Sequence, residues 1–264
     1  MEALAETPQP EAEVVDTHCH LFLMEGEAPT IVQDAREAGV TAIVCVGVDH
    51  ETSRLSRDLA DAISGVFATA GVHPHTASAF DAAVGGAIEE LLADPRVVAV
   101  GESGLDYFRL RSPKEEQQRA LRVHCALARE TGKAIVVHVR DAWVDAMAIL
   151  EEERLDRVVL HCFTGDEAVA AEAGARGYFC SFAGPITYPT NEALRKAAAI
   201  LPEERLLVET DSPFLPPQPL RGRENEPRNA VAVVDALAAA RETDPWGVAA
   251  ATTRNARAAF GLPG

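Results

Sequence analysis

The chain has 264 residues, of which 47% are hydrophobic and 25% are charged, so its bulk is an ordinary globular sequence and intrinsic disorder is excluded. It carries 24 basic and 41 acidic residues, a formal net charge of −17, which excludes the broadly basic surface of a general nucleic-acid-binding protein. No run of about 18 apolar residues indicates a membrane span, and the acidic amino terminus lacks the apolar segment of a signal peptide.

The first residues differ in composition from the rest of the chain. Residues 1–12 contain Pro8, Pro10 and several glutamates, so we expect a flexible acidic tail there and a single domain over residues 13–264. The sequence has 5 cysteines and no C-x-x-C pair, which favours reduced thiols in a cytoplasmic protein. We expect a monomer with no membrane partner.

From residue 13 onward, short apolar runs alternate with longer amphipathic segments. The predicted strands are Glu13–Asp16, Thr41–Gly47, Val66–Val72, Val97–Gly101, Ala134–His138, Val158–His161, Tyr178–Ser181 and Leu206–Glu209. The predicted helices are Pro29–Ala38, Thr52–Ile63, Phe80–Leu92, Pro113–Thr131, Ala142–Glu153, Asp166–Ala175, Asn191–Ile200, Val231–Arg241 and Trp246–Phe260. Strands that are apolar on both faces indicate a parallel sheet that is covered on both sides.

The number of strand–helix alternations bears on the fold class. Eight of them in a chain of 264 residues predict an α/β fold of the TIM (β/α)8 barrel type. A doubly wound open sheet stays the alternative, because periodicity does not show whether a sheet closes. The longest irregular segment, Pro213–Pro227, follows the last predicted strand, and we expect it to cover a site.

Polar residues gather at the carboxyl ends of the predicted strands, which meet on one face of a barrel. They are Asp16, His18 and His20 after the first strand, His73 and His75 after the third, Glu102 and Asp106 after the fourth, His138 and Arg140 after the fifth, His161 after the sixth, and Glu209 and Asp211 after the eighth. Of the 8 histidines, all but His50 and His124 lie at these ends. A single histidine there is more often structural, but imidazoles and carboxylates gathered in this way form the ligand set for Zn²⁺, Mn²⁺ or a similar ion.

The spacing of these residues predicts roles for them. His18 and His20 are two residues apart, so on an extended strand both side chains face the same ion. Glu102 comes from the middle of the ring and could bridge two ions, of which His138 and His161 would hold the second. Asp211 would complete the first site and face its bound water. Cys19 and Cys162 adjoin these ligands, and we expect both to point away from the site and pack in the barrel wall.

The same residues fall in stretches that resemble a known family. These stretches are VVDTHCHL (14–21), GVHPH (71–75), VGESGLDYFR (100–109), VVHVRDA (136–142), LHCFTG (160–165), SFAGPITY (181–188), LLVETDSPFL (206–215), RGRENEP (221–227) and TTRNARAAFGL (252–262). In these stretches the chain resembles the TatD family of metal-dependent hydrolases. The resemblance implies an amidohydrolase-like barrel, usually two divalent metal ions (Mg²⁺, Mn²⁺ or Zn²⁺), and phosphodiester hydrolysis, often as a 3′→5′ exonuclease on single-stranded DNA or RNA.

The resemblance also assigns functions to individual residues. His18 and His20 match the first metal-binding pair, Glu102 matches the bridging glutamate, and His138 and His161 match the second-site histidines. Asp211 matches the aspartate that binds metal and accepts a proton from the attacking water. His73 matches a histidine near the phosphate, so Asp211, Glu102 and His73 are the expected catalytic residues. Phe22 departs from the pattern, since Asp or Asn usually stands there.

Basic residues near the predicted mouth are the candidates for binding a phosphate, because guanidinium groups pair with phosphate in a bidentate way. Arg109, Arg111 and Lys114 follow the fourth strand, Arg140 ends the fifth, and Arg221, Arg223 and Arg228 follow the eighth. Solvated loop charge is an equally good explanation of the two loop clusters. We take His73, Arg109, Arg140, Arg221 and Arg223 as the candidate substrate-binding residues. Asp106 could pair with one of the arginines instead of binding metal.

The motifs and the charges are compatible with three functions. The first is a two-metal phosphodiesterase that acts on nucleic-acid ends. The second is an amidohydrolase or esterase on a small substrate, or on an aminoacyl ester of RNA, and the basic residues mildly favour the first over the second. The third is a metal-binding scaffold without activity, which the candidate base Asp211 disfavours.

Overall fold

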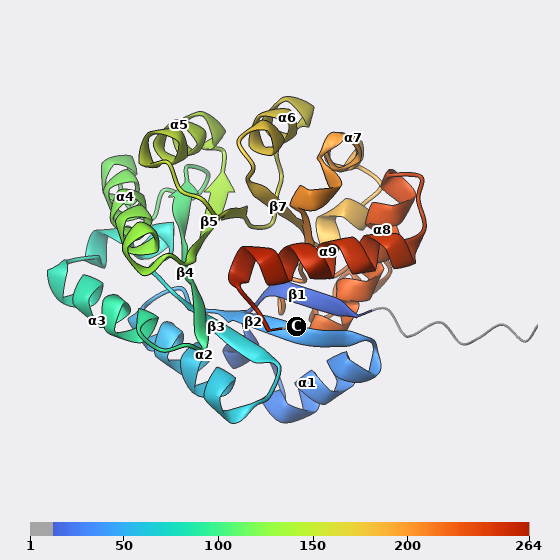
Figure 1. The fold of residues 1–264 in the computed structure, drawn as a ribbon, viewed down its shortest axis with the longest axis horizontal. Helices are drawn as coiled ribbons and strands as arrows, with labels where there is room; N and C mark the ends of the chain where they lie inside the picture. The colour runs from blue at the N-terminus through green and yellow to red at the C-terminus, as the bar shows by residue number, and fades with distance from the viewer. Residues whose placement is uncertain (1–12, 264) are drawn as a thin grey trace, which may run out of the picture.

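The computed structural model describes residues 13–263, and the predicted acidic tail, residues 1–12, lies outside the described residues. Within residues 13–263, eight strands form one sheet in the order β1-β2-β3-β4-β5-β6-β7-β8, and each strand is parallel to the next (Figure 1). The strands are β1 (Val14–Cys19), β2 (Val40–Val46), β3 (Val66–Ala70), β4 (Val97–Asp106), β5 (Ala134–Arg140), β6 (Val158–Leu160), β7 (Phe179–Phe182) and β8 (Leu206–Val208). This sequential order excludes the doubly wound sheet, in which the strand order reverses.

The sheet closes on itself where β8 meets β1. Cys19 and Ser212 form a parallel bridge, and the backbone N–H of His20 donates to the carbonyl of Ser212 at 2.7 Å. The N–H of Asp211 likewise donates to the carbonyl of His18 at 2.8 Å. These contacts confirm the predicted barrel and bring His18, His20 and Asp211 to one place at its carboxyl end.

Helices cover the outside of the barrel, with one or more between successive strands (Figure 1). They are α1 (Ala28–Glu37), α2 (His50–Ala62), α3 (Ala82–Leu92), α4 (Lys114–Thr131), α5 (Trp143–Glu153), α6 (Glu167–Ala175), α7 (Glu192–Ile200), α8 (Ala230–Ala240) and α9 (Pro245–Phe260). Short 3₁₀ turns are Leu21–Leu23, Pro74–Ala79, Gly184–Thr187, Glu203–Arg205, Gln218–Leu220 and Pro227–Asn229. The helix predicted from Phe80 begins two residues later, because the side chain of Asp81 accepts hydrogen bonds from the N–H groups of Ala83 and Val84 and so caps α3.

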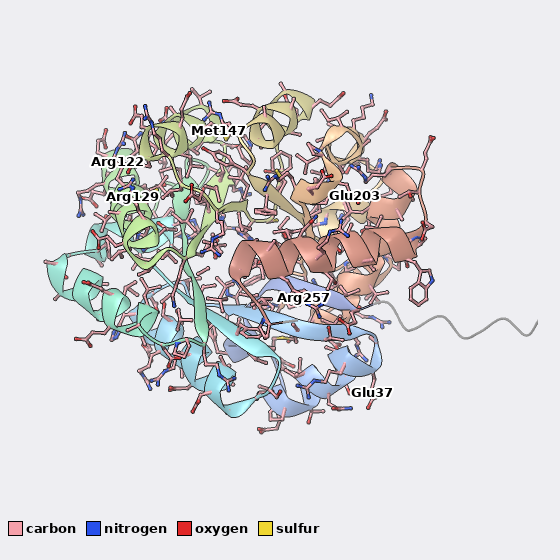
Figure 2. All side chains as sticks on the ribbon, viewed as in Figure 1. Glu37, Arg122, Arg129, Met147, Glu203 and Arg257 are labelled. Carbon is pink, nitrogen blue, oxygen red and sulfur yellow. The ribbon has the colours of Figure 1, made fainter. Side chains whose placement is uncertain are left out.

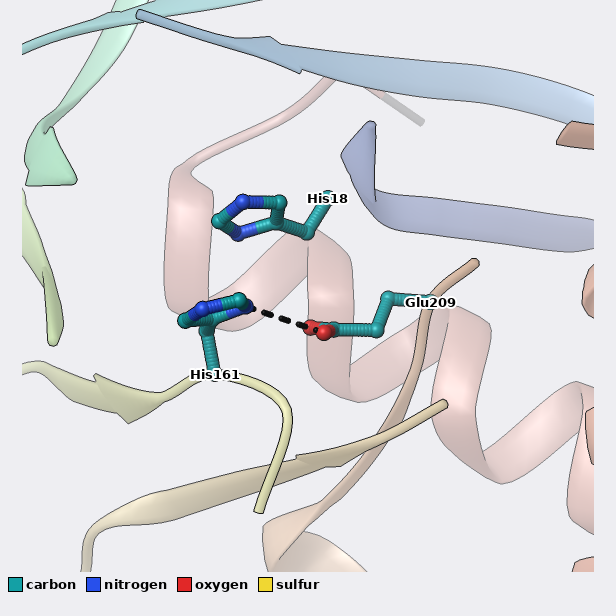
Figure 3. Close-up of side chains that lie close together, drawn as sticks. All are labelled: His18, His161 and Glu209. Atoms are coloured by element: carbon teal, nitrogen blue, oxygen red, sulfur yellow. Dashed lines mark hydrogen bonds and ion pairs between the residues drawn. The ribbon is translucent and has the colours of Figure 1, made fainter. Parts of the chain in front are cut away.

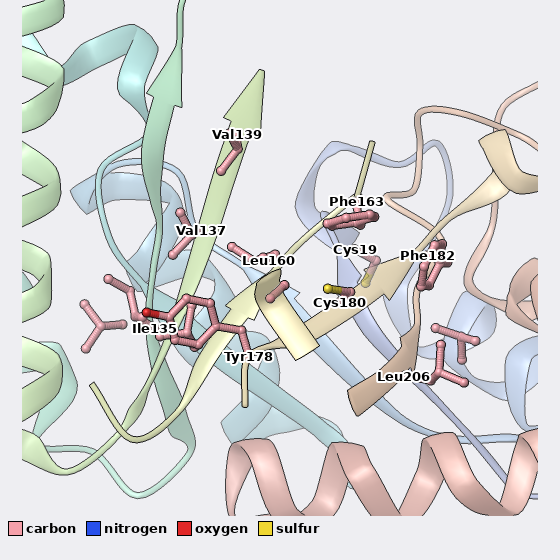
Figure 4. Packing of buried hydrophobic residues seen from close by; sticks show 14 of the residues in the cluster. Cys19, Ile135, Val137, Val139, Leu160, Phe163, Tyr178, Cys180, Phe182 and Leu206 are labelled. Carbon is pink, nitrogen blue, oxygen red and sulfur yellow. The ribbon is translucent and has the colours of Figure 1, made fainter. Parts of the chain in front are cut away.

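Apolar side chains fill two regions of the fold. The larger region lies between the sheet and the helices and includes Ile135, Leu160 and Phe182 (Figure 4). The smaller region combines inward-facing strand residues such as Val15 and Leu207 with Phe260 of α9. Helix α9 lies across the barrel beside β1 (Figure 1). Since α9 packs at the amino end, the carboxyl end of the barrel is the one that stays open for a site.

Strand β4 is longer than predicted, and this difference positions Glu102. The prediction ended the strand at Gly101, but pairing with β5 continues to the register partners Asp106 and Arg140. Gly104 permits this pairing, because its φ is +144° and a Cβ there would overlap the carbonyl oxygen of His138. Glu102 therefore lies within a strand and is buried, not in a loop beyond it.

Ion pairs on the outer surface join neighbouring helices. Arg122 and Arg129 project from α4, and their guanidinium groups lie 3.3 Å and 2.6 Å from the carboxylate of Glu153 on α5 (Figure 2). These pairs are partly exposed, so each contributes little to stability. Over residues 13–263, no helix combines the length and the apolar character needed to cross a membrane.

Candidate metal centre

Glu102 lies at the centre of a histidine cluster in the open end of the barrel. Its Oε2 is 3.4 Å from Nε2 of His18, and its Oε1 is 3.0 Å from Nδ1 of His138 and 3.0 Å from Nε2 of His161. Burial by itself would raise the pKa of this carboxyl, but the facing histidines, His161 and His73 foremost, hold it well below its usual range. The structure thus brings an ionised carboxylate together with imidazoles that lie in β1 and β5 or follow β3 and β6, and each of its oxygens faces a different part of the cluster.

The first part of the cluster consists of His18, His20 and Glu102, whose ligand atoms all lie within 4.8 Å of one another. Asp211 adds a fourth donor, since its Oδ1 is 3.5 Å from Nε2 of His20 and 3.8 Å from Nε2 of His18. The Nδ1–H of His20 donates to the carbonyl of Val46 at 2.8 Å, so the lone pair of Nε2 faces Asp211. These residues have the chemistry and spacing of a divalent-cation site.

The second part consists of His73, Glu102 and His138, whose ligand atoms also lie within 4.8 Å of one another. His161 joins this part, with Nε2 3.4 Å from Nδ1 of His138. Burial lowers the pKa of His73 to about 3, so its imidazole is neutral, which is the form that binds a metal. The resemblance gave His73 only a place near the phosphate, whereas Nε2 of His73 is 3.5 Å from Glu102 and within reach of an ion held there.

A buried histidine without a partner supports metal binding by these residues. Both ring nitrogens of His18 are buried and accept or donate no hydrogen bond within residues 13–263. Leaving a buried polar atom unpaired is costly, and a cation bound to Nε2 would satisfy it. The residues present therefore fit a metal ion on the His18 side of Glu102. The group of His73, Glu102 and His138 fits a second metal ion.

Glu209, which the sequence places only at the end of a strand, hydrogen-bonds to His161 on the side away from Glu102. Its fully buried carboxylate accepts from Nδ1–H of His161 at 3.0 Å and from the backbone N–H of Cys162 at 2.9 Å (Figure 3). Burial alone would lower the pKa of His161, but the charges of Glu102 and Glu209 raise it well above its usual value. The hydrogen bond fixes the ring so that Nε2 faces Glu102, as carboxylates behind metal-binding histidines do.

Asp106 has a similar position behind the second part of the cluster. Its Oδ2 lies 2.9 Å from Nε2 of His75 and 3.4 Å from Nε2 of His138. The hypothesis that Asp106 pairs with an arginine is wrong for the side chain of Arg109, because only the backbone N–H of that residue donates to Asp106, at 2.8 Å. Asp106 instead hydrogen-bonds to His75 and lies beside His138.

Asp16 joins the first strand to the segment that follows the last strand, next to the candidate metal ligands. The carboxyl accepts from the backbone N–H of Thr210 at 2.9 Å and from its hydroxyl at 2.6 Å, and the N–H of His18 lies 3.3 Å away. Burial raises the pKa of Asp16 to about 8. This network holds Thr210 and the adjacent Asp211 against the strand that carries His18 and His20.

A pocket of about 1040 Å³ opens above the cluster. The metal-ligand candidates that line it are His20, His73, Glu102, His138, His161 and Asp211. Arg109, Arg111 and Arg140 also line it, whereas Arg221 and Arg223 are not among its lining residues. The guanidinium of Arg221 lies over the ring of Tyr188, 4.7 Å from its centroid. Phe214 and Leu215, from the irregular segment after β8, line the pocket as expected for a segment that covers a site.

The two cysteines beside the cluster differ in their surroundings. Cys19 is fully buried in the core between the sheet and the helices, as predicted. Cys162 is only partly buried and lines the pocket, so the prediction that it packs in the wall is wrong. The strand-alternation argument does not apply to it, because β6 ends at Leu160 and the φ of Cys162 is +41°.

Comparisons with known proteins agree with this arrangement. A family model described as TatD related DNase matches residues 15–261. The chain is 40% identical over 259 residues to a Mycobacterium tuberculosis (strain ATCC 25618 / H37Rv) protein named an uncharacterized metal-dependent hydrolase TatD, with 94% of this chain and 98% of the relative covered. It is 36% identical over 239 residues to the 3′-5′ ssDNA/RNA exonuclease TatD of Escherichia coli (strain K12), with 88% of this chain and 92% of that protein covered.

A solved structure matches the whole fold as well. The crystal structure of YJJV, a TatD homologue from Escherichia coli K12, superposes with a TM-score of 0.92 at 29% identity, and the match covers 96% of this chain and 100% of that one. The family model and the relatives both span nearly all of the chain, including every strand that contributes to the cluster. The chain belongs to the TatD family and is a metal-dependent hydrolase.

Proposed function

We propose that this hydrolase removes nucleotides from the 3′ ends of single-stranded DNA or RNA, using two divalent cations. The observation that carries the proposal is the position of Glu102 between two groups of ligands, on the floor of a pocket that Arg109, Arg111 and Arg140 also line. A phosphodiester is the substrate that uses both features, since guanidinium groups bind its charge beside the cluster. The name of the Escherichia coli relative supports the same substrate class.

The residues divide into two ligand groups that share Glu102. His18, His20, Glu102 and Asp211 would hold one Zn²⁺, Mn²⁺ or Mg²⁺ ion. Glu102, His138 and His161 would hold the other, with His73 beside them. Such ions, when bound, lower the pKa of a coordinated water and neutralise the charge of a phosphoryl group.

Asp211 accepts the proton of the attacking water in this proposal. Burial alone would raise the pKa of Asp211, but the neighbouring imidazoles of His20, His161 and His18 hold it below its usual range. The carboxylate is therefore ionised at neutral pH and ready to accept a proton. Its backbone is held by the hydrogen bond to His18, so the base keeps its position relative to the first ligand pair.

The phosphate is held by basic groups on the β4 and β5 side of the pocket. Arg109 lies just after β4, and Arg140 ends β5 and is a register partner of Asp106. The neutral ring of His73 lines the same pocket, 3.5 Å from Glu102. On a chain with a net charge of −17, these arginines together with the bound cations would attract the polyanion to the pocket and not to the surface in general.

Labelled oligonucleotides test the proposal directly. Purified protein is incubated with 5′-labelled and 3′-labelled single strands and with Mg²⁺, Mn²⁺ or Zn²⁺, alongside a panel of carboxylic and aminoacyl esters. We expect the 5′ label to appear in a ladder of successively shorter strands and the 3′ label to appear at once as a mononucleotide. Asp211→Asn is the matched inactive control. Ester hydrolysis without release of nucleotides would replace the nuclease with a small-substrate hydrolase.

A further inference from the structure

An exposed aromatic ring stands at the edge of the metal pocket, and the proposed chemistry does not use it. Phe214 lines the pocket, yet 51% of the residue is exposed to solvent. Aromatic residues make up only 5% of the chain, and within residues 13–263 most of the large apolar side chains are buried in the core. An exposed ring of this size at the edge of a site indicates a binding surface.

The segment that carries Phe214 is fixed by hydrogen bonds. The N–H of Phe214 donates to the carbonyl of Asp211 at 2.9 Å, and its own carbonyl accepts from Nδ2 of Asn225 at 2.8 Å. Asn225 is fully buried and also donates from Nδ2 to the carbonyl of Thr210 at 2.8 Å. The backbone that carries the ring is thus fixed before any ligand arrives, which reduces the entropy lost on binding.

The ring of Phe214 lies close to the proposed reacting centre. Its centroid lies 6.0 Å from that of the His20 ring, at an interplanar angle of 67°, and Phe214 follows the proposed base Asp211 by three positions in the sequence. Arg109 and Arg140 come from β4 and β5, which lie opposite β8 in a barrel of sequential order. The groups that bind phosphate and the apolar ring therefore approach the metal ligands from opposite sides of the mouth.

We propose that Phe214 stacks against the base of the 3′-terminal nucleotide while its phosphodiester lies at the metal ligands; this rests on the nuclease function proposed above. Every nucleobase has a π-face, so such a contact selects a nucleotide over other phosphoesters without selecting one base. A flat apolar ring without a hydrogen-bonding group is suited to that role. The contact makes Phe214 a specificity-determining residue for nucleic acid.

A four-way comparison isolates the contact. Wild type and Phe214→Ala are compared on two 5′-labelled oligonucleotides that differ only in whether the 3′-terminal nucleotide carries a base or is abasic, and kcat/KM is measured for each. For the wild type, we expect kcat/KM to be lower on the abasic strand than on the complete strand by on the order of tenfold or more. For Phe214→Ala, we expect kcat/KM on the complete strand to fall by about the same factor, and kcat/KM on the abasic strand to change little. Phe214→Trp should keep the preference for the complete strand, because tryptophan also offers an aromatic ring. Trp246→Ala serves as the control, since Trp246 is 42% exposed and is not a lining residue of the metal pocket.

The results separate this inference from the function on which it rests. If the wild type cleaves neither strand, the nuclease proposal fails and the stacking role fails with it. If the wild type cleaves both but Phe214→Ala keeps the same ratio between the two strands, the nuclease stands and the stacking role is refuted. A melting temperature equal to that of the wild type shows that the variant is folded.

Discussion

Replacing Glu209 by glutamine tests whether the charge behind His161 controls metal binding. In the wild type, Oε1 accepts hydrogen bonds from Nδ1–H of His161 at 3.0 Å and from the N–H of Cys162 at 2.9 Å. Glutamine keeps the shape and an accepting oxygen but removes the charge. A hydrogen bond to a charged group contributes about 1.5–3 kcal/mol, and one to a neutral group about 0.5–1.5 kcal/mol. The substitution should therefore weaken the hydrogen bond that orients His161 by about 1.4 kcal/mol. That cost corresponds to roughly tenfold weaker metal binding, at the lower end of the range for such partners.

Calorimetric titration of metal-free protein with Zn²⁺ or Mn²⁺ measures this effect without reference to activity. Glu209→Gln should show the weaker dissociation constant for one ion and an unchanged circular dichroism spectrum. Glu192→Gln is the matched control, because the side chain of Glu192 is 73% exposed and lies on the outer helix α7. Equal dissociation constants for Glu209→Gln and the wild type would refute the reasoning that Glu209 orients His161 through its charge.

Four further outcomes are expected. Asp211→Asn should lower kcat by about 10²–10⁴-fold with a smaller loss of metal affinity, and a rate near that of the wild type would exclude Asp211 as the base. EDTA should abolish turnover while circular dichroism retains most of the helix signal, because the barrel has its own apolar core; loss of that signal would contradict this. Burial lowers the pKa of His124 from 6.5 to about 4, so its contribution to stability is complete above pH 6.5 and is lost as the pH falls toward 4, about 3 kcal/mol in all. Urea unfolding at several pH values should show a shallower acid slope for His124→Gln than for the wild type, and equal slopes would count against the assignment. Arg140→Ala should weaken oligonucleotide binding and reduce the salt slope by about 0.7, with Arg221→Ala as the comparison; an equal effect of Arg221→Ala would make that residue a phosphate contact too.

Much of the arrangement can be predicted from the sequence, because parallel strands end at the same edge of a sheet. That rule alone predicts that His18, Glu102, His138 and Asp211 lie together, without any knowledge of interatomic distances. Closure of the sheet depends on the contact of Cys19 with Ser212, which strand periodicity does not contain.

The residues behind the ligands are harder to predict, since their roles depend on orientation. Glu209 follows the last apolar run as Asp211 does, and only the distance to His161 distinguishes a supporting carboxylate from a ligand. Loop arginines are harder still. Arg140 lies on a strand and lines the pocket, whereas the side chain of Arg221 lies over Tyr188, a contact between two loops that neither strand nor helix periodicity specifies.

The hydrogen bonds between Asp16 and Thr210 have a consequence for synthesis of the chain. Among the strands, the ribosome makes β1 first and β8 last, and the proposed first ligand group takes residues from or next to both. A nascent chain that has not reached residue 210 contains His18 and His20 but has neither Asp211 nor the threonine that Asp16 holds. With Asp211 as the proposed base, hydrolytic competence would arise only once the barrel is complete, and prematurely terminated fragments would carry histidines without that base.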